Sequence, residues 1–128
     1  MDSETGKITW FDLTVPNADE VKDFYSKVVG WKSEPFAMQG YNDYNMQTPV
    51  NGETVAGICH ARGENSNLPA QWLIYITVDN IEASATACKN NGGKIVAPIK
   101  EMGTYGKSCV IKDPAGAVAA LFESMKKT

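Results

Sequence analysis

Residues of different character alternate between two sides of the chain from Lys7 to Pro16, and this period of two predicts a strand with two different faces. The faces carry Phe11, Leu13 and Val15 on one side and Trp10, Asp12 and Thr14 on the other. After Pro16, apolar residues recur with helical spacing as far as Gly30, which predicts an amphipathic helix. Because the apolar face of that helix must be covered, we expect the Phe11 face of the strand to pack under it and the Asp12 face to lie opposite.

Strand signals fill the rest of the first half. Asn17 and Glu20 have the spacing of a capping box at the start of the helix. Strands are predicted over residues 32–38, 44–48 and 54–61. The last two are joined by a hairpin turn at Asn51-Gly52, and residues 61–70 are expected to be a polar linker.

The second half repeats this order of elements. Leu13 and Ile76, Val15 and Val78, and Gly30 and Gly93 are related by one constant offset. Such an offset indicates an internal duplication. The second copy predicts a helix over 81–91 and strands over 71–78, 94–99, 105–111 and 117–123. We therefore expect one domain spanning residues 1–128, built from a βαβββ repeat at 7–61 and a second at 71–123.

The motifs V-P-N…FY…GW and W-L-I-Y-I-T-V-D-N-I…GG…D-P-A-G resemble the vicinal oxygen chelate superfamily, which includes glyoxalase I, extradiol dioxygenases and bleomycin-resistance proteins. The resemblance runs from Ile8 to Glu123. It implies an α+β fold in which two tandem βαβββ modules form a glyoxalase-like open barrel with a central cleft. In the enzymes of this family, side chains in the cleft hold a divalent metal.

The resemblance places the metal ligands of the family at Trp10, near Ala56, at Leu73 and at Ala120. None of these side chains can ligate a divalent cation, which needs imidazole, carboxylate or thiolate groups. We therefore expect no metal site and no cofactor.

Two polar residues of the predicted cleft face carry alternative interpretations. Asp12 could bind a cationic ligand or act as a base, or it could simply pair with a nearby Lys or a backbone amide. His60 is the only histidine, and alternation places it on the cleft side near a strand end. It could shuttle a proton, although a lone histidine at a strand end is more often solvated.

Small-molecule pockets are mostly apolar and aromatic with few polar groups. We expect the ligand to contact Trp10, Asp12, Tyr44, Met46, His60, Tyr75 and Tyr105. Cys59 is expected on the helix side, and a nucleophilic thiol is not expected. The segment from Glu101 to Gly103 could close over the cleft or be an ordinary surface loop.

Charge and composition narrow the class of partner. The net charge is −3 with a pI of about 5.1, and no run of Lys or Arg occurs, which argues against a nucleic-acid or anionic-membrane partner. The N-terminus does not resemble a signal peptide, and no stretch is long enough to span a bilayer. The three cysteines lack CxxC spacing, as expected of reduced thiols in the cytoplasm.

The sequence thus predicts a cytoplasmic, metal-free protein that binds a small molecule between its two repeats, as a homodimer like the bleomycin-resistance branch. The alternative is a glyoxalase- or dioxygenase-like enzyme acting on a small carbonyl or aromatic substrate. A third interpretation is a metal-independent isomerase or lyase with Asp12 or His60 as its base. The sequence leaves open whether the protein is an enzyme.

Overall fold

The computed structural model describes residues 3–125, whose contacts divide the chain into two units. The first unit comprises residues 10–72 and the second comprises residues 3–9 and 73–125. Each combines four strands with one long helix. Neither α-helix of the described residues is long and apolar enough to cross a membrane.

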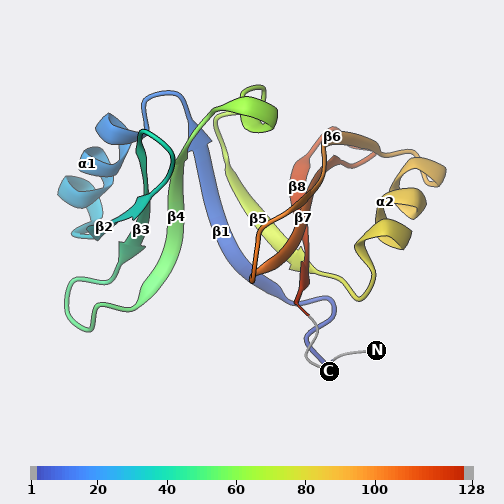
Figure 1. The fold of residues 1–128 in the computed structure, drawn as a ribbon, viewed down its shortest axis with the longest axis horizontal. Coiled ribbons are helices and arrows are strands. Elements are labelled where there is room, and N and C mark those ends of the chain that lie inside the picture. The colour runs from blue at the N-terminus through green and yellow to red at the C-terminus, as the bar shows by residue number, and fades with distance from the viewer. Residues whose placement is uncertain (1–2, 126–128) are drawn as a thin grey trace. The chain divides into compact units, whose positions relative to one another are not determined.

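The first unit has the order strand, helix and three strands (Figure 1). Its elements are β1 (Ile8–Val15), α1 (Ala18–Val29), β2 (Lys32–Ala37), β3 (Asn42–Gln47) and β4 (Thr54–His60). The strand order is β2-β3-β4-β1, with β1 parallel to β4 and the other pairs antiparallel. The predicted hairpin joins β3 to β4, where Gly52 has the positive φ of 67° that such a turn requires.

The second unit repeats this order after a short 3₁₀ turn, η1 (Gly63–Asn65). Its elements are β5 (Trp72–Thr77), α2 (Ile81–Asn90), β6 (Lys94–Glu101), β7 (Gly106–Lys112) and β8 (Val118–Ser124). The strand order is β5-β8-β7-β6. Residues 3–9 belong to this unit because Thr77 exchanges backbone hydrogen bonds of 2.8 and 2.9 Å with Gly6 and Lys7. The predicted α+β class with tandem βαβββ modules is confirmed.

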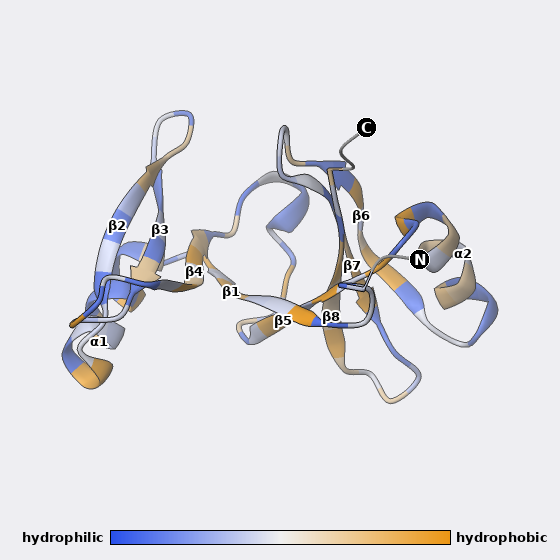
Figure 2. Cartoon of the chain, turned by 90° about the horizontal axis from the view of Figure 1, so that it is seen from below, coloured by the Kyte–Doolittle hydropathy of each residue, from blue (hydrophilic) through white to orange (hydrophobic). Residues whose placement is uncertain are grey.

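The core of the first unit lies between α1 and one face of its strands. Leu13 and Val15 of β1 pack there with Ala18 of the helix, as the alternation of β1 predicts. Strands β3 and β4 contribute Tyr44, Met46, Ala56 and Ile58. Figure 2 shows both hydrophobic and hydrophilic segments on α1, as an amphipathic helix requires.

Two of the predicted helix ends are made as the sequence indicates, and one is not. Gly30 ends α1 with φ 84°, and its N–H donates to the carbonyl of Ser26 at 3.1 Å. The side chain of Asn80 caps α2 by accepting from the N–H of Ala83 at 3.0 Å. The capping box predicted at Asn17 is wrong, because its amide group donates to Glu20 at 3.3 Å and makes no cap hydrogen bond.

The second core is built under α2. Ile81, Ala85, Cys109 and Leu121 are buried there, together with partly buried residues that include Ile76 and Val78. Strand β6 runs two residues beyond its predicted end at Ile99, because Lys100 and Glu101 pair with Ser108 and Lys107 of β7.

Tyr44 joins the core of the first unit to the start of α1. Its ring is buried, and its hydroxyl donates to the carboxylate of Asp19 at 2.5 Å. This hydrogen bond, and secondly burial, raise the pKa of Tyr44 to about 12. The ammonium group of Lys22 lies 4.9 Å from the centre of the same ring.

We expect Tyr44→Phe to lower the free energy of unfolding by about 1 kcal/mol at neutral pH, because it removes a hydrogen bond to a charged but largely exposed carboxylate. The pKa of Tyr44 is higher in the folded chain, so its contribution is complete below pH 10 and is lost as the pH rises towards 12. The difference between wild type and variant should therefore shrink over that range. Urea unfolding at pH 7, 10 and 11 measures it, with exposed Tyr105→Phe as the control that should stay within about 0.5 kcal/mol of wild type.

Candidate functional site

The carboxylate of Asp12 lies at the centre of the sheet face that is turned away from α1 in the first unit. It is only 8% exposed, although a lone carboxylate is rarely buried. The indole N–H of Trp10 donates to its Oδ1 at 3.2 Å, and the thiol of Cys59 donates to its Oδ2 at 3.3 Å. These two hydrogen bonds hold the carboxylate in place. Asp12 is thus hydrogen-bonded to an indole and a thiol, whereas a Lys or a backbone amide was the expected partner.

Gly57 provides the space that this carboxylate occupies. Asp12 and Gly57 are direct partners in the parallel register of β1 and β4. A Cβ atom added at Gly57 would overlap Oδ1 of Asp12 and would approach the ring of Trp10 to 3.2 Å. Only glycine at this position lets the carboxylate and the indole lie where they do. We use the name Asp12 surface for the group formed by Trp10, Asp12, Gly57 and Cys59.

The expectation that Cys59 points to the helix side is wrong. It lies beside Asp12, because Thr14 and Cys59 are register partners and therefore share the face opposite α1. Burial, and secondly the negative charge of Asp12, raise the pKa of the Cys59 thiol far above its ordinary value. The thiol is protonated at neutral pH and acts as a donor, not as a nucleophile.

His60 lies on the α1 side and not on the Asp12 surface, which corrects its predicted placement. Its Nδ1 is 3.4 Å from a carboxylate oxygen of Asp43, and its Nε2 is 3.6 Å from one of Asp19. Its backbone N–H donates to Asp43 at 2.8 Å, and the ring of Tyr41 meets it edge-on at 5.4 Å. The side chain is 11% exposed, so the alternative of a solvated histidine is also wrong.

Tyr44 and Met46 are core residues beneath α1. Met46 has no exposed surface, and Tyr44 is buried. Tyr44, Met46 and His60 were expected on the cleft face, and this placement is wrong. The antiparallel register pairs Tyr44 with Ile58 and Met46 with Ala56, and this set packs against the helix. The Asp12 surface is therefore made by the alternate residues, Gly57 and Cys59 among them.

The two remaining predicted ligand contacts lie in the second unit. Tyr75 is half-buried on β5 and pairs with Ala120 of β8. Tyr105 is exposed in the turn before β7. Their contact with a ligand, like the cleft between the repeats, stays a prediction.

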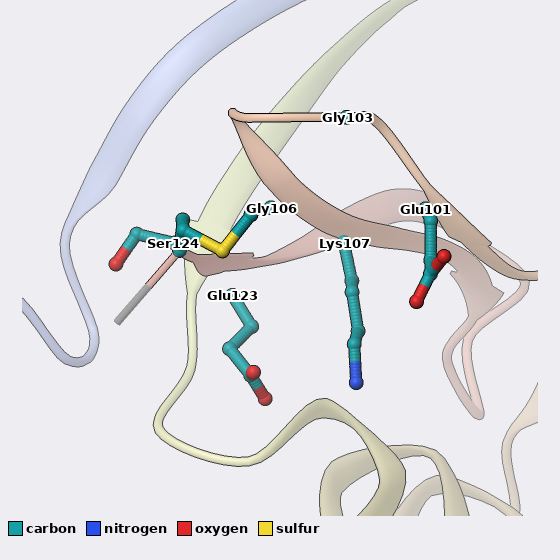
Figure 3. A pocket seen from close by; sticks show the side chains of 7 residues that line it. Glu101, Gly103, Gly106, Lys107, Glu123 and Ser124 are labelled. Atoms are coloured by element: carbon teal, nitrogen blue, oxygen red, sulfur yellow. The ribbon is translucent and has the colours of Figure 1, made fainter. Parts of the chain in front are cut away.

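Glu101 and Gly103, from the segment that could close over the cleft or be an ordinary surface loop, line a pocket of about 300 Å³ within the second unit (Figure 3). Lys107 and Glu123 project beside them, and both contact α2. Glu123 accepts from the backbone N–H of Ile81 at 2.8 Å, and Lys107 bonds to Glu82 at 2.9 Å. The hydrogen bond to Glu82, together with its charge, raises the pKa of Lys107. These two side chains hold the start of α2.

A second pocket, not foreseen from the sequence, lies in the first unit. It has a volume of about 330 Å³ and is lined by Phe11, Trp31, Val55, Ala56 and Trp72. We call it the tryptophan pocket. Phe11 belongs to the face of β1 that was expected to pack under α1, yet it is 44% exposed. An aromatic residue at the end of an otherwise covered face, with a tryptophan directly after the helix stop, is the signal that could have indicated it.

The residues at the family's ligand positions do not fit a metal. Trp10 forms part of the Asp12 surface, while Leu73 and Ala120 are buried apolar side chains. Near the fourth position, Ala56 faces the core and Gly57 faces Asp12. Glycine supplies no ligand either. Between residues 3 and 125, no group of three or more His, Cys, Asp or Glu side chains is placed to hold a metal ion.

Solved structures share this fold. A hypothetical protein from Bacillus halodurans is similar with a TM-score of 0.62 and 13% identity, over 96% of this chain and 97% of its own. Methylmalonyl-CoA epimerase from Mycobacterium tuberculosis is similar with a TM-score of 0.59 and 12% identity, over 98% of this chain and 93% of its own. At these identities the likeness concerns the fold alone.

Curated proteins are similar to this chain in sequence, and two of them are described here by name. "Putative glyoxylase CFP32" from Mycobacterium bovis is 29% identical over 93% of this chain and 46% of its own length. "Anthracycline biosynthesis protein DnrV" from Streptomyces peucetius is 25% identical over 91% of this chain and 46% of its own. The chain thus spans about half the length of these relatives. The family profile itself matches residues 7–121, and the chain belongs to the Glyoxalase/Bleomycin resistance protein/Dioxygenase superfamily.

Proposed function

We propose that this protein binds a small aromatic molecule without a metal, and that the Asp12 surface supplies the aromatic wall and the negative charge of its binding site. The supporting observation is the pairing of the Trp10 indole with the buried carboxylate of Asp12 over Gly57. A ring fixed in this way offers a flat apolar contact at little cost in side-chain entropy.

The charges near Trp10 favour a ligand with a positive charge or several hydrogen-bond donors. Asp12 is buried there, and Asp43 is close enough to Cys59 to raise the pKa of its thiol as well. An aromatic cation gains both from the indole ring and from these carboxylates. The unsuitable side chains at the family's ligand positions support binding without a metal.

The relatives' names support a small molecule as the partner, since one is named for anthracycline biosynthesis and the other as a glyoxylase. The second name also favours the alternative function, an enzyme of the glyoxalase or dioxygenase type. That alternative requires a metal to polarise its substrate.

We further propose that the protein acts as a homodimer in the cytoplasm. Phe24, Val28 and Val29 of α1 are exposed apolar side chains that a second copy would cover. Cys59, Cys88 and Cys109 are free thiols, as in a reducing compartment.

We expect Trp10→Ala to weaken the binding of proflavine, a planar aromatic cation, about tenfold, because the loss of one aromatic contact to a cation is worth about 1 kcal/mol or more. Fluorescence titration in buffer with EDTA measures this. Trp10→Phe, which keeps a ring, should retain most of the affinity. Val50→Ala, which shortens an exposed side chain in the turn between β3 and β4, should bind as wild type does. Equal affinity of wild type and Trp10→Ala would contradict the proposal.

Asp12→Asn tests the role of the charge. An amide oxygen at the place of Oδ1 can still accept from Trp10 at 3.2 Å and from Cys59 at 3.6 Å, so the fold should persist while the negative charge is lost. We expect the affinity for proflavine to fall several-fold. The affinity for the anionic dye fluorescein should rise relative to that of wild type. An unchanged preference between the two dyes would show that Asp12 does not select the ligand's charge.

A further inference from the structure

We propose that the tryptophan pocket is a second binding site, which takes the uncharged apolar end of an aromatic molecule. Its volume of about 330 Å³ falls within the range of small-molecule sites, which begins at about 300 Å³. Its lining of Phe11, Trp31, Val55, Ala56 and Trp72 contains no charged side chain. A charged group would lose its hydration there without gaining a partner.

The aromatic rings around the pocket form a fixed cluster. Trp31 and Trp72 meet edge-to-face with centres 5.9 Å apart, and Tyr25 contacts Trp72 in the same manner at 5.4 Å. The indole N–H of Trp72 donates to the hydroxyl of Tyr25 at 3.0 Å. Since this donor is already used inside the cluster, Trp72 presents ring carbon to an occupant, and edge-to-face packing is the contact that an aromatic ligand can extend.

Phe11 makes the pocket accessible. Its ring is 44% exposed, whereas Leu13 and Val15 on the same face of β1 are buried under α1. An apolar ligand would therefore cover a ring that water now contacts. Burial of apolar surface on both partners is the driving force for binding in such a site.

The tryptophan pocket is separate from the Asp12 surface. Trp10 and Phe11 are consecutive in β1, so their side chains project to opposite faces of the strand. Trp10 is hydrogen-bonded to Asp12, while Trp31 and Trp72 line the pocket. The three tryptophans of the chain thus report separately on the two sites.

The test is a titration of the ¹⁵N-labelled full chain with naphthalene, a neutral aromatic probe, followed by NMR of the three indole N–H signals. We expect saturable shifts at Trp31 and Trp72 and none at Trp10. Naphthalene-2-sulfonate, with its fixed charge, should bind at least fivefold more weakly.

Three variants make the test specific. Phe11→Ala should weaken naphthalene binding at least fivefold, and Val55→Phe should abolish it by filling the pocket. Phe36→Ala is the matched control, because this phenylalanine is 41% exposed in the same unit but does not line the pocket. It should bind naphthalene within twofold of wild type.

The proposal is overturned if Trp31 and Trp72 do not shift up to the solubility limit of the probe, or if Phe11→Ala and Phe36→Ala bind it equally. Signals of Trp31 and Trp72 that move on dilution of the protein alone would assign the pocket to an interface between copies and would overturn it too. Each result is independent of proflavine binding at Trp10.

Discussion

The buried carboxylate of Asp12 is the constraint on which the candidate site depends. A charge at this position of β1 is tolerated because an indole N–H and a thiol point at its oxygens. Gly57 is required by the same arrangement, since any side chain there would displace the carboxylate. The high pKa of Cys59 follows from it as well, because the thiol is buried beside that charge. The position of the Asp12 carboxylate thereby requires a glycine at position 57 and keeps the neighbouring thiol of Cys59 protonated.

The alternation of strand side chains separates the chemistry of the first unit into two sides. The α1 side carries the core, with Tyr44 and His60 joined to Asp19 at the start of the helix. The opposite side carries the Asp12 surface. Charged groups of the second unit have a structural role of a similar kind, since Lys107 and Glu123 hold the start of α2. In both units, titratable side chains thus attach the start of a helix to a neighbouring strand.

The fold could be predicted from the sequence and the site only in part. The helical period before Gly30, the hairpin at Gly52 and the repeated order predict the elements, because each depends on local backbone preferences. The faces of β3 and β4 could not be predicted, since alternation groups residues without saying which group meets the helix. For that reason the predicted faces of Met46 and Cys59 are both the opposite of the observed ones. The tryptophan pocket joins Phe11 to Trp72, residues far apart in the sequence, and depends on tertiary packing.

We propose that this member of the superfamily works without a metal, because Trp10, Gly57, Leu73 and Ala120, at or beside the positions that the resemblance assigns to the family's ligands, carry no ligating group. The most direct test is the metal content of the native protein by elemental mass spectrometry, after incubation with nickel, zinc, iron and manganese followed by dialysis without chelator. If the protein works without a metal, far less than one divalent ion per chain is expected. One tightly held ion per chain would contradict it and would favour the enzyme of the glyoxalase or dioxygenase type.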